Sequence, residues 1–314
     1  MKLKYGVVGT GALGGFYGGK LAKAGHDVHF LLRSDFEHVK EQGLKVDSVD
    51  GDFLLQPIAC YNSAQDMPVC DVVLVCMKTT GNHLLPELLD PIIDEQSLVI
   101  LVQNGLGIEE RLAQEVPHAS VAGGIAFICA HKVGPGHVSH LDLGRLILGL
   151  HTSTGNELLQ QCQQDFEQAG VPAQLAENLG YIRWQKLVWN VPFNGLAVVL
   201  NTTTDQLMKQ KETRELAHEM MHEVIFGAKN CGYDLDPDFA DKMIRTTEKM
   251  TPYAPSMKLD FDNRRAMEIE SIYTSPVQAA RQAGFEMKKV AMLESQLRFI
   301  ASQMENWKIR VSEG

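Results

Sequence analysis

The sequence contains no apolar run that approaches the roughly twenty residues needed to cross a bilayer, so we expect no membrane span and no membrane partner. It also lacks an excess of basic residues, since 29 Lys and Arg stand against 39 Asp and Glu, a net charge of −10. That balance argues against a general nucleic-acid surface, because such surfaces are basic. The six cysteines include no C-x-x-C pair, which favours free thiols in a reducing cytoplasm over disulfides.

A secretion signal is not expected either, because Met1-Lys2-Leu3-Lys4 leads directly into a short apolar strand. The 314 residues suggest two domains with sizeable cores, since 45% of them are hydrophobic. Apolar runs at 72–77, 98–102 and 121–128 are typical of strands buried on both faces in a parallel sheet. Helix-like segments at 82–89 and 107–115 lie between them.

Later segments change in character. We predict a hairpin of 137–141 and 145–150 that turns at Asp142-Leu143-Gly144, and then a helix over 156–168. From about Asn178 helical periodicity takes over, with helices predicted for 216–232, 262–282 and 287–304. The fold class is therefore α/β, with a Rossmann-type parallel-sheet domain over 1–177 and an all-helical domain over 178–314. Clefts between domains are common ligand sites.

The most informative segment is Gly9-Thr10-Gly11-Ala12-Leu13-Gly14, which follows an apolar strand and opens a helix. In this context G-x-G-x-x-G is a dinucleotide-binding fingerprint rather than an ordinary glycine-rich surface turn. Gly9 allows the tight turn, Gly11 lets the pyrophosphate approach the backbone, and Gly14 lets the helix pack closely on the strand. Free N–H groups at the start of the helix bind the phosphates.

The second strand, 26–32, indicates which dinucleotide is bound. It is followed by Arg33, where NAD-binding proteins usually carry Asp or Glu. A guanidinium can hold a ribose 2′-phosphate with two charge-assisted hydrogen bonds, so NADP(H) is favoured. Two alternatives remain. If the strand ended later, Asp35 would be the acid of an NAD site, and Arg33 can also be a solvated charge at the end of a strand.

Lys78 and Asn104 follow two successive predicted strands at corresponding places. Because ligands of open parallel sheets bind outside the carboxyl ends of the strands, we expect both side chains to face the crevice of the glycine turn. Lys78 could meet an anionic substrate or cofactor, and Asn104 could orient the nicotinamide or bond the substrate. The alternatives are a solvated Lys at a strand end and an Asn in a turn.

Lys186, Asn190 and Asn194 recur every four residues in an otherwise apolar segment, so on a helix they form one polar line. Buried polar groups need partners, and the candidates are a bound substrate or, on an exposed stripe, solvent. An ammonium group in an apolar setting releases its proton more readily, which makes Lys186 a candidate catalytic acid. Pro192 is a possible kink in this helix.

A second four-residue repeat follows Pro252 and Pro255, which break the chain. It consists of Asp260, Arg264 and Glu268, and by itself this spacing is typical of a solvated ion-pair face.

His218-Glu219-Met220-Met221-His222 matches the H-E-x-x-H signature of zinc proteases and would place both His on one helix face. The extended form of that signature needs Gly and His where this chain has Ile225 and Ala228. Five-residue matches arise easily by chance in a Glu-rich helix. We therefore predict no metal, and a zinc hydrolase stays only as an alternative.

Together these motifs resemble those of the ketopantoate reductases (2-dehydropantoate 2-reductases), and the resemblance runs nearly end to end. The shared marks are Gly9-x-Gly11-Ala12-Leu13-Gly14, Arg33, Lys78, Gln103-Asn104-Gly105-Leu106-Gly107, Lys186-x3-Asn190-x3-Asn194, and Ser256-Met257 with Asp260 and Glu268-Ile269-Glu270. The family reduces 2-dehydropantoate to pantoate with NADPH, on the route to pantothenate and coenzyme A.

The resemblance implies a role for each of these residues. It implies that Gly9, Gly11, Ala12, Leu13, Gly14 and Arg33 bind NADP(H), that Lys78 and Asn104 contact cofactor or substrate, that Lys186 and Glu268 are catalytic with Lys186 as the proton donor, and that Asn190, Asn194, Ser256 and Glu268 hold the substrate, with Asn201 near a further substrate-binding position. The expected partner is thus a small 2-oxo acid.

Two departures from the family's usual residues lie near the expected pocket walls, Thr79-Thr80-Gly81 and Ile272-Tyr273-Thr274. They leave another 2-oxo acid, or a non-catalytic NADP-sensing protein, open beside 2-dehydropantoate. The oligomeric state is also open, with a homodimer among the possibilities.

Overall fold

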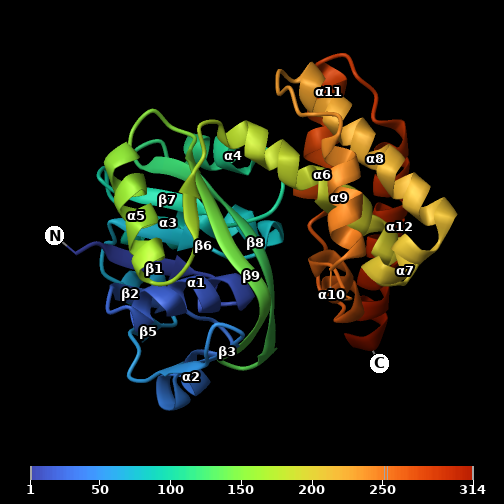
Figure 1. Cartoon of the computed structure of the whole chain (residues 1–314). Helices are drawn as coiled ribbons and strands as arrows, with labels where there is room; N and C mark the ends of the chain where they lie inside the picture. Colours follow the sequence, from blue (N-terminus) through green and yellow to red (C-terminus); the bar gives the residue numbers. More distant parts are fainter. Residues whose placement is uncertain (1, 251, 253, 313–314) are drawn as a thin grey trace. The chain divides into compact units, whose positions relative to one another are not determined.

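Strands and helices alternate through the first half of the chain, and helices make up the second (Figure 1). The structure, a computed structural model, describes residues 2–250, 252 and 254–312, with side chains to residue 304. Within these residues the chain divides into two compact units. Unit 1 comprises 1–103 and 108–179, and unit 2 comprises 104–107 and 180–314.

Unit 1 is an α/β unit. Its strands are β1 Lys4–Val8, β2 Asp27–Leu31, β3 Leu44–Ser48, β4 Phe53–Leu55, β5 Cys60–Tyr61, β6 Val72–Val75, β7 Leu98–Leu101, β8 Ser120–Gly134, β9 His137–Leu150 and β10 Ala173–Leu175. Its helices are α1 Ala12–Lys23, α2 Phe36–Gln42, α3 Leu85–Leu89, α4 Ile108–Glu115 and α5 Asn156–Gln168, with short 3₁₀ turns η1 Ala64–Asp66, η2 Thr79–Leu84 and η3 Asp90–Ile92. The helix predicted over 156–168 is confirmed.

The strands pair in the order β4-β3-β9-β8-β7-β6-β1-β2-β5, with β10 on β9. From β5 to the start of β8 all neighbours are parallel, whereas β8–β9 and β3–β4 are antiparallel. The predicted Rossmann-type sheet is therefore confirmed, although the complete sheet is mixed. The strand order reverses at β1, which has β2 on one side and β6 on the other. Ligands of open α/β sheets bind at such a switch point.

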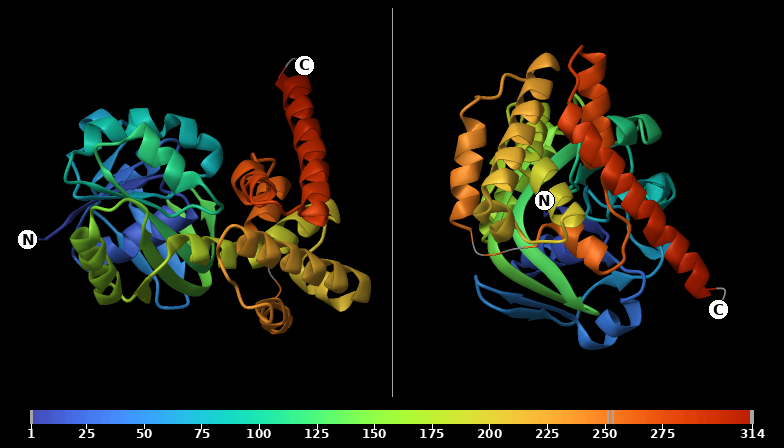
Figure 2. Two further views of the ribbon diagram at one scale, coloured as in Figure 1. Left: turned by 90° about the horizontal axis from the view of Figure 1, so that it is seen from above. Right: turned by 90° about the vertical axis from the view of Figure 1, so that its right-hand side faces the viewer.

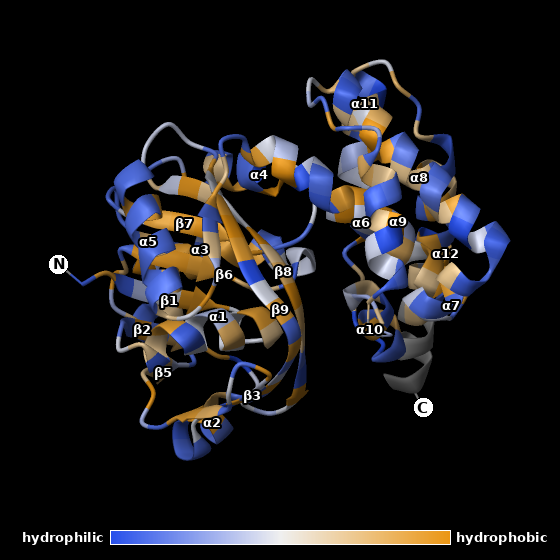
Figure 3. Cartoon of the chain, in the orientation of Figure 1, coloured by the Kyte–Doolittle hydropathy of each residue, from blue (hydrophilic) through white to orange (hydrophobic). Residues whose placement is uncertain are grey.

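Both faces of this sheet are covered by helices (Figure 2, left). Val72 and Leu74 pack into a core shared with α1 and α5, whereas Val73 and Val75 pack into a core shared with α3 and α4. Because successive side chains of a strand point to opposite faces, a strand buried on both sides must be apolar throughout. This accounts for the hydrophobic strands in Figure 3.

The hairpin predicted around Asp142-Leu143-Gly144 is wrong. β8 and β9 are long strands that pair with each other, and the chain turns between Gly134 and His137. Asp142-Leu143-Gly144 is an irregularity inside β9, with φ of 65° at Leu143 and 121° at Gly144. His140 Nε2 lies 3.1 Å from the carbonyl oxygens of both Asp142 and Leu143. Bulges and turns both use positive φ, so local sequence does not separate them.

Unit 2 is helical. Its elements are α6 Leu179–Val199, α7 Thr204–Lys209, α8 Lys211–Asn230, α9 Phe239–Glu248, α10 Ser256–Asp262, the π-helical turn η4 Glu270–Thr274, α11 Ser275–Gln282 and α12 Lys288–Ser312. Apolar side chains from α6, α8, η4, α11 and α12 form its core. None of the helices in the described part of the chain combines the length and apolar character that a membrane crossing requires.

The helix predicted over 262–282 is wrong in its first part. α10 ends at Asp262, and Arg264 then adopts a φ of 54°. The backbone N–H of Arg265 donates to the Asp260 carbonyl at 2.8 Å, and its Nε donates to the Asp260 carboxylate at 3.0 Å, which closes a turn. The prediction of a solvated ion-pair face is wrong for the same reason. Asp260, Arg264 and Glu268 do not share a helix, and Glu268 is buried.

Candidate active site

The glycine turn between β1 and α1 is built around close backbone contacts. Gly9 has a φ of 95°, and a methyl group there would lie 2.4 Å from the backbone nitrogen of Met77. A methyl group on Gly14 would lie 2.4 Å from the carbonyl oxygen of Gly9. At Gly11, by contrast, an added methyl group meets nothing within 4 Å. Gly9 and Gly14 are thus required by the fold itself, whereas Gly11 leaves open space beside the turn.

The N-terminus of α1, which begins at Ala12 and Leu13, is suited to an anion. Gly11 is its N-cap, and within the described chain neither a capping side chain nor an acidic first-turn residue satisfies it. The first N–H groups of a helix have no partners inside the helix and carry partial positive charge. Thr10 Oγ1 donates to the Leu31 carbonyl at 3.1 Å and ties the turn to the end of β2. These features fit the phosphates of a dinucleotide.

Arg33 and Lys78 lie at the same edge of the sheet as this turn. Val8, the last residue of β1, pairs with Leu31 at the end of β2 and with Val75 at the end of β6. Arg33 follows β2 and Lys78 follows β6, and both residues are exposed. The edge therefore carries two cations, which a chain of net charge −10 needs in order to bind an anionic cofactor.

Asp35 is not available as the acid of an NAD site. β2 ends at Leu31, and the buried Asp35 carboxylate pairs with Lys132 Nζ at 2.5 Å and accepts the Gly136 N–H at 2.9 Å. Burial alone would raise the pKa of Asp35, but the hydrogen bonds from Lys132, Gly136 and Ser34 outweigh it and lower the pKa. Asp35 thus holds the β8–β9 hairpin.

The hydrogen-bonded amide pair of Gln103 and Asn82 has no counterpart among the sequence predictions. Gln103 Nε2 donates to Asn82 Oδ1 and to the Met77 carbonyl, each at 2.7 Å, and Asn82 Nδ2 donates back to Gln103 Oε1 at 3.2 Å. The pair ties the Thr79–Leu84 turn to the end of β7. Because the two residues follow different strands, only the pairing of β6 with β7 reveals it.

Unit 2 contains the polar line of α6. All of Lys186, Asn190 and Asn194 lie in this helix, with Asn190 4% and Asn194 1% exposed and Lys186 half-buried. Asn190 Nδ2 donates to Asn104 Oδ1 across 3.5 Å, a long hydrogen bond. The structure therefore places Asn104 with the α6 residues in unit 2, although it follows β7 in the sequence.

Asn194 has a partner in the protein itself. Its Oδ1 accepts the backbone N–H of Met257 at 3.1 Å. This bond satisfies one of the free donors at the start of α10, where Ser256 is the first residue and is half-buried. Asn194 therefore fixes the backbone that carries Ser256.

Glu268 lies just before η4 and is 4% exposed. The segment after Asn104 packs against this turn, since the Leu106 N–H donates to the Ser271 carbonyl at 2.9 Å. Gly105 adopts a φ of 111°, and a methyl group there would lie 2.4 Å from Ser271 Cβ. Unit 2 thus holds an ammonium, amides, a hydroxyl and a buried carboxylate, the groups needed to bind and protonate a 2-oxo acid.

Two other sequence candidates lie elsewhere in unit 2. Asn201 follows α6, is exposed and has a φ of 48°, a conformation that Asn commonly adopts after a helix. His218 and His222 do share one face of α8, with ring centroids 4.6 Å apart, and His218 Nε2 lies 2.9 Å from Asp241 Oδ1. In the described chain, no group of three or more His, Cys, Asp and Glu side chains is placed to hold a metal ion.

Comparison with known proteins covers both units. The family model described as "Ketopantoate reductase PanE/ApbA" matches residues 5–153, and the model of its C-terminal part matches residues 178–301. A 2-dehydropantoate 2-reductase of Nostoc sp. is 47% identical over 95% of each chain.

Solved structures agree with this match. A 2-dehydropantoate 2-reductase from Geobacter metallireducens superposes with a TM-score of 0.91 at 38% identity, covering 94% of this chain and 99% of its own. A D-mandelate dehydrogenase solved with NADH and anilino(oxo)acetate shares the fold, with a TM-score of 0.87 at 20% identity over 96% of this chain and 99% of its own. This second neighbour shows the fold alone, whereas the family models and the Nostoc relative show the family. This chain belongs to the ketopantoate reductase family.

Proposed function

We propose that this protein reduces 2-dehydropantoate to pantoate with NADPH. The proposal depends on two features that occur together in this member of the family. One is the open glycine turn followed by Arg33, and the other is the line of polar residues on the mostly buried helix α6. The first feature suits the cofactor, and the second suits a small polar substrate that is held away from water.

The residues of unit 1 fit the cofactor, because the space beside Gly11 is open and the first turn of α1 is uncapped. Gly9, Gly11, Ala12, Leu13 and Gly14 would hold the pyrophosphate, Arg33 the 2′-phosphate, and Lys78 a further anionic or polar group. When bound, NADPH supplies the hydride that reduces the ketone carbon. The protein supplies position and charge.

Lys186 is the proposed proton donor. Its ammonium group would lie against the ketone oxygen, stabilise the negative charge that develops there, and deliver the proton that completes the hydroxyl group. A donor fixed in advance can lower such a barrier by on the order of 3 kcal/mol. After each turnover Lys186 regains a proton from solvent, so the reaction consumes one hydride and one proton for each ketone reduced.

The remaining polar residues are proposed to orient the substrate. Asn104, Asn190 and Ser256 would bond its carboxylate and hydroxyl ends, and Asn194 would act through the α10 backbone that it holds. Glu268 is proposed as the second catalytic residue, because a buried carboxylate can hold the substrate hydroxyl. For Asn201 the substrate role stays a prediction.

The proposal is tested by following NADPH oxidation by the purified protein against a panel of 2-oxo acids that includes 2-dehydropantoate, 2-oxoisovalerate and phenylglyoxylate. We expect the highest kcat/KM with 2-dehydropantoate. A clear preference for another member would assign the protein to a different 2-oxo acid, as the departures in the Thr79–Leu84 turn and at Tyr273 allow. Tight NADPH binding without turnover of any member would indicate a sensor.

We also propose a cytoplasmic location and a homodimer. The six cysteines are free, which fits a reducing compartment. The assembly is tested by the mass of the protein in solution.

A further inference from the structure

Helix α6 contains a proline in its interior, between the residues of its polar line. Pro192 has no N–H, so the carbonyl of Val188 loses the partner that an uninterrupted helix would provide. Lys186 and Asn190 precede this point and Asn194 follows it. The relative placement of these side chains therefore depends on how the helix is held at Pro192, because prolines are common sites of helix kinks.

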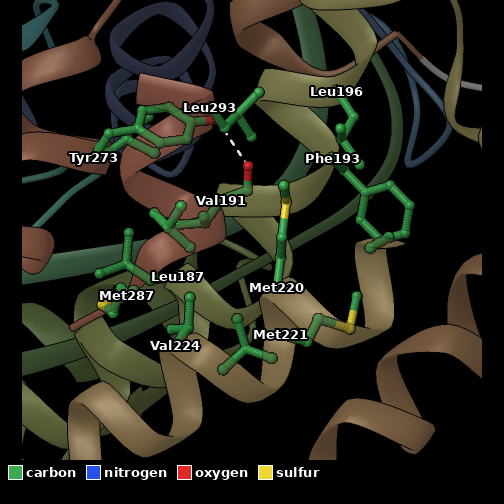
Figure 4. Packing of buried hydrophobic residues seen from close by; sticks show 14 of the residues in the cluster. Leu187, Val191, Phe193, Leu196, Met220, Met221, Val224, Tyr273, Met287 and Leu293 are labelled. Carbon is green, nitrogen blue, oxygen red and sulfur yellow. Dashed lines mark hydrogen bonds between the residues drawn. The ribbon is translucent and has the colours of Figure 1, made fainter. Parts of the chain in front are cut away.

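The side chain of a tyrosine from another element contacts α6 next to Pro192. Tyr273 Oη donates to the Val191 carbonyl at 2.8 Å (Figure 4). Val191 and Gly195 are the pair that bond directly to each other in a regular helix. The hydroxyl thus bonds the residue just before Pro192 and lies close to Gly195, where an added methyl group would be 2.7 Å from it.

The surroundings of this hydroxyl leave it little freedom. Tyr273 is 0% exposed and lies among Leu187, Val191 and Leu293 in the core of unit 2 (Figure 4). A methyl group on Gly195 would lie 2.7 Å from Tyr273 Oη and 2.5 Å from a Leu293 methyl carbon, so glycine is what permits the close approach. Burial raises the pKa of Tyr273 well above its usual value, so the hydroxyl keeps its proton and remains a donor.

Tyr273 belongs to η4, the π-helical turn that begins two residues after Glu268. Such turns are rare and occur frequently at functional sites. The same turn accepts the Leu106 N–H through Ser271 and so contacts the segment that begins at Asn104. One short element therefore connects three parts of the proposed substrate site.

We infer that Tyr273 is a positioning residue of the reduction, whose hydroxyl fixes the course of α6 at Pro192 and thereby aligns Lys186 and Asn190 with Glu268. This inference rests on the proposed function. Tyr273 itself does not touch the reacting atoms. It lies in one of the two segments where this chain departs from the family's usual residues.

The test compares Tyr273→Phe with Tyr5→Phe. Tyr5 is a matched control, because it is also 0% exposed and its hydroxyl donates to Asp165 at 2.6 Å, but in unit 1. Both variants remove one buried tyrosine hydroxyl together with its hydrogen bonding, and they should lose similar stability. We expect Tyr273→Phe to lower kcat about tenfold and to raise KM for the 2-oxo acid, because small misplacements of catalytic groups reduce rates strongly. Its NADPH dissociation constant should stay within about twofold of wild type, and Tyr5→Phe should keep wild-type kcat and KM.

Gly195→Ala provides a second route to the same displacement, since its methyl group would occupy the space of the hydroxyl. We expect the same fall in kcat and rise in KM. If Tyr273→Phe loses stability as Tyr5→Phe does but keeps wild-type kcat and KM, the inference is overturned while the proposed function stands. If the wild-type protein reduces no 2-oxo acid, the proposed function fails first, and the inference fails with it.

Discussion

The two units build their proposed binding sites from different materials. In unit 1 the site is mainly backbone, with the Gly9 turn packed against Met77, the uncapped start of α1, and open space beside Gly11. In unit 2 it is mainly side chain, with Asn190, Asn194 and Glu268 almost fully buried. A dinucleotide presents phosphates, which backbone N–H groups and helix ends recognise well. A small keto acid needs individual donors at defined positions.

This difference governs how each site responds to substitution. In unit 1 Gly9 and Gly14 define the turn through close backbone contacts, and Gly11 leaves open space beside it. Substitutions of these glycines should therefore affect only cofactor binding or the folding of that unit. In unit 2 each polar side chain depends on a distant element, as Asn194 depends on α10 and α6 depends on η4. Substitutions there should alter turnover while leaving cofactor affinity intact.

The largest effect is expected for Lys186→Ala. Loss of the proposed proton donor should lower kcat by about 10²–10⁴-fold. The NADPH dissociation constant should change less than about twofold, because the proposed cofactor contacts lie in unit 1. Single-turnover rates and NADPH fluorescence titrations measure the two quantities separately, with Lys186→Arg as the variant that retains a positive charge. Equal losses of turnover and of NADPH affinity would remove Lys186 from the donor role.

The next effect concerns the choice of cofactor. Arg33→Ala should weaken NADPH binding by about 10–100-fold, since a hydrogen-bonded charge pair contributes about 1.5–3 kcal/mol, and should leave NADH binding nearly unchanged. Arg111→Ala is the control, because Arg111 is also an exposed arginine of unit 1 but pairs with Glu115 at 3.1 Å. Parallel changes for NADPH and NADH would mean that Arg33 does not contact the 2′-phosphate.

Local sequence predicts part of each unit, and the reason is physical. The glycine turn and the helix over 156–168 are specified by residues adjacent in the chain. The sequence predicts a turn at Asp142-Leu143-Gly144 because bulges and turns use the same residues, and only the long pairing of β8 with β9 distinguishes them. The helix over 262–282 failed where Arg265 folds back onto Asp260, a contact that helical periodicity does not encode.

The candidate sites show the same contrast between residues that are near in the chain and contacts that join distant segments. The sequence indicates Lys186, Asn190 and Asn194 as a polar line because all three lie on one helix. It does not indicate that Asn194 holds Met257, that Gln103 pairs with Asn82, or that Tyr273 enters α6, because each of these contacts joins segments far apart in the chain. Polar residues in apolar segments show that a partner exists, but not which one.

Gly11→Ala tests whether the cofactor binds at the glycine turn of unit 1. Because an added methyl group meets no atom within 4 Å, the variant should fold with the stability of wild type. We expect NADPH affinity to fall about tenfold, since the methyl group takes space that the pyrophosphate needs. Gly9→Ala is the contrasting variant and should destabilise the protein through its contact with Met77. Unchanged NADPH affinity in Gly11→Ala would place the cofactor away from this turn.

The smallest expected effect tests whether Asp35 is structural, as its contacts with Lys132 and Gly136 indicate. Its folded pKa is lowered, so the ionised carboxylate stabilises the protein above its unfolded pKa of about 3.9. That contribution is lost as the pH falls through the folded pKa. At pH 7 Asp35→Asn should therefore reduce the free energy of unfolding by ~1 kcal/mol, and the difference from wild type should shrink below about pH 4. Urea unfolding at a series of pH values measures both, with cofactor affinity as the second readout. A variant that keeps its stability but loses NADH affinity would return Asp35 to the nucleotide site and would remove the distinction between a backbone-built and a side-chain-built half.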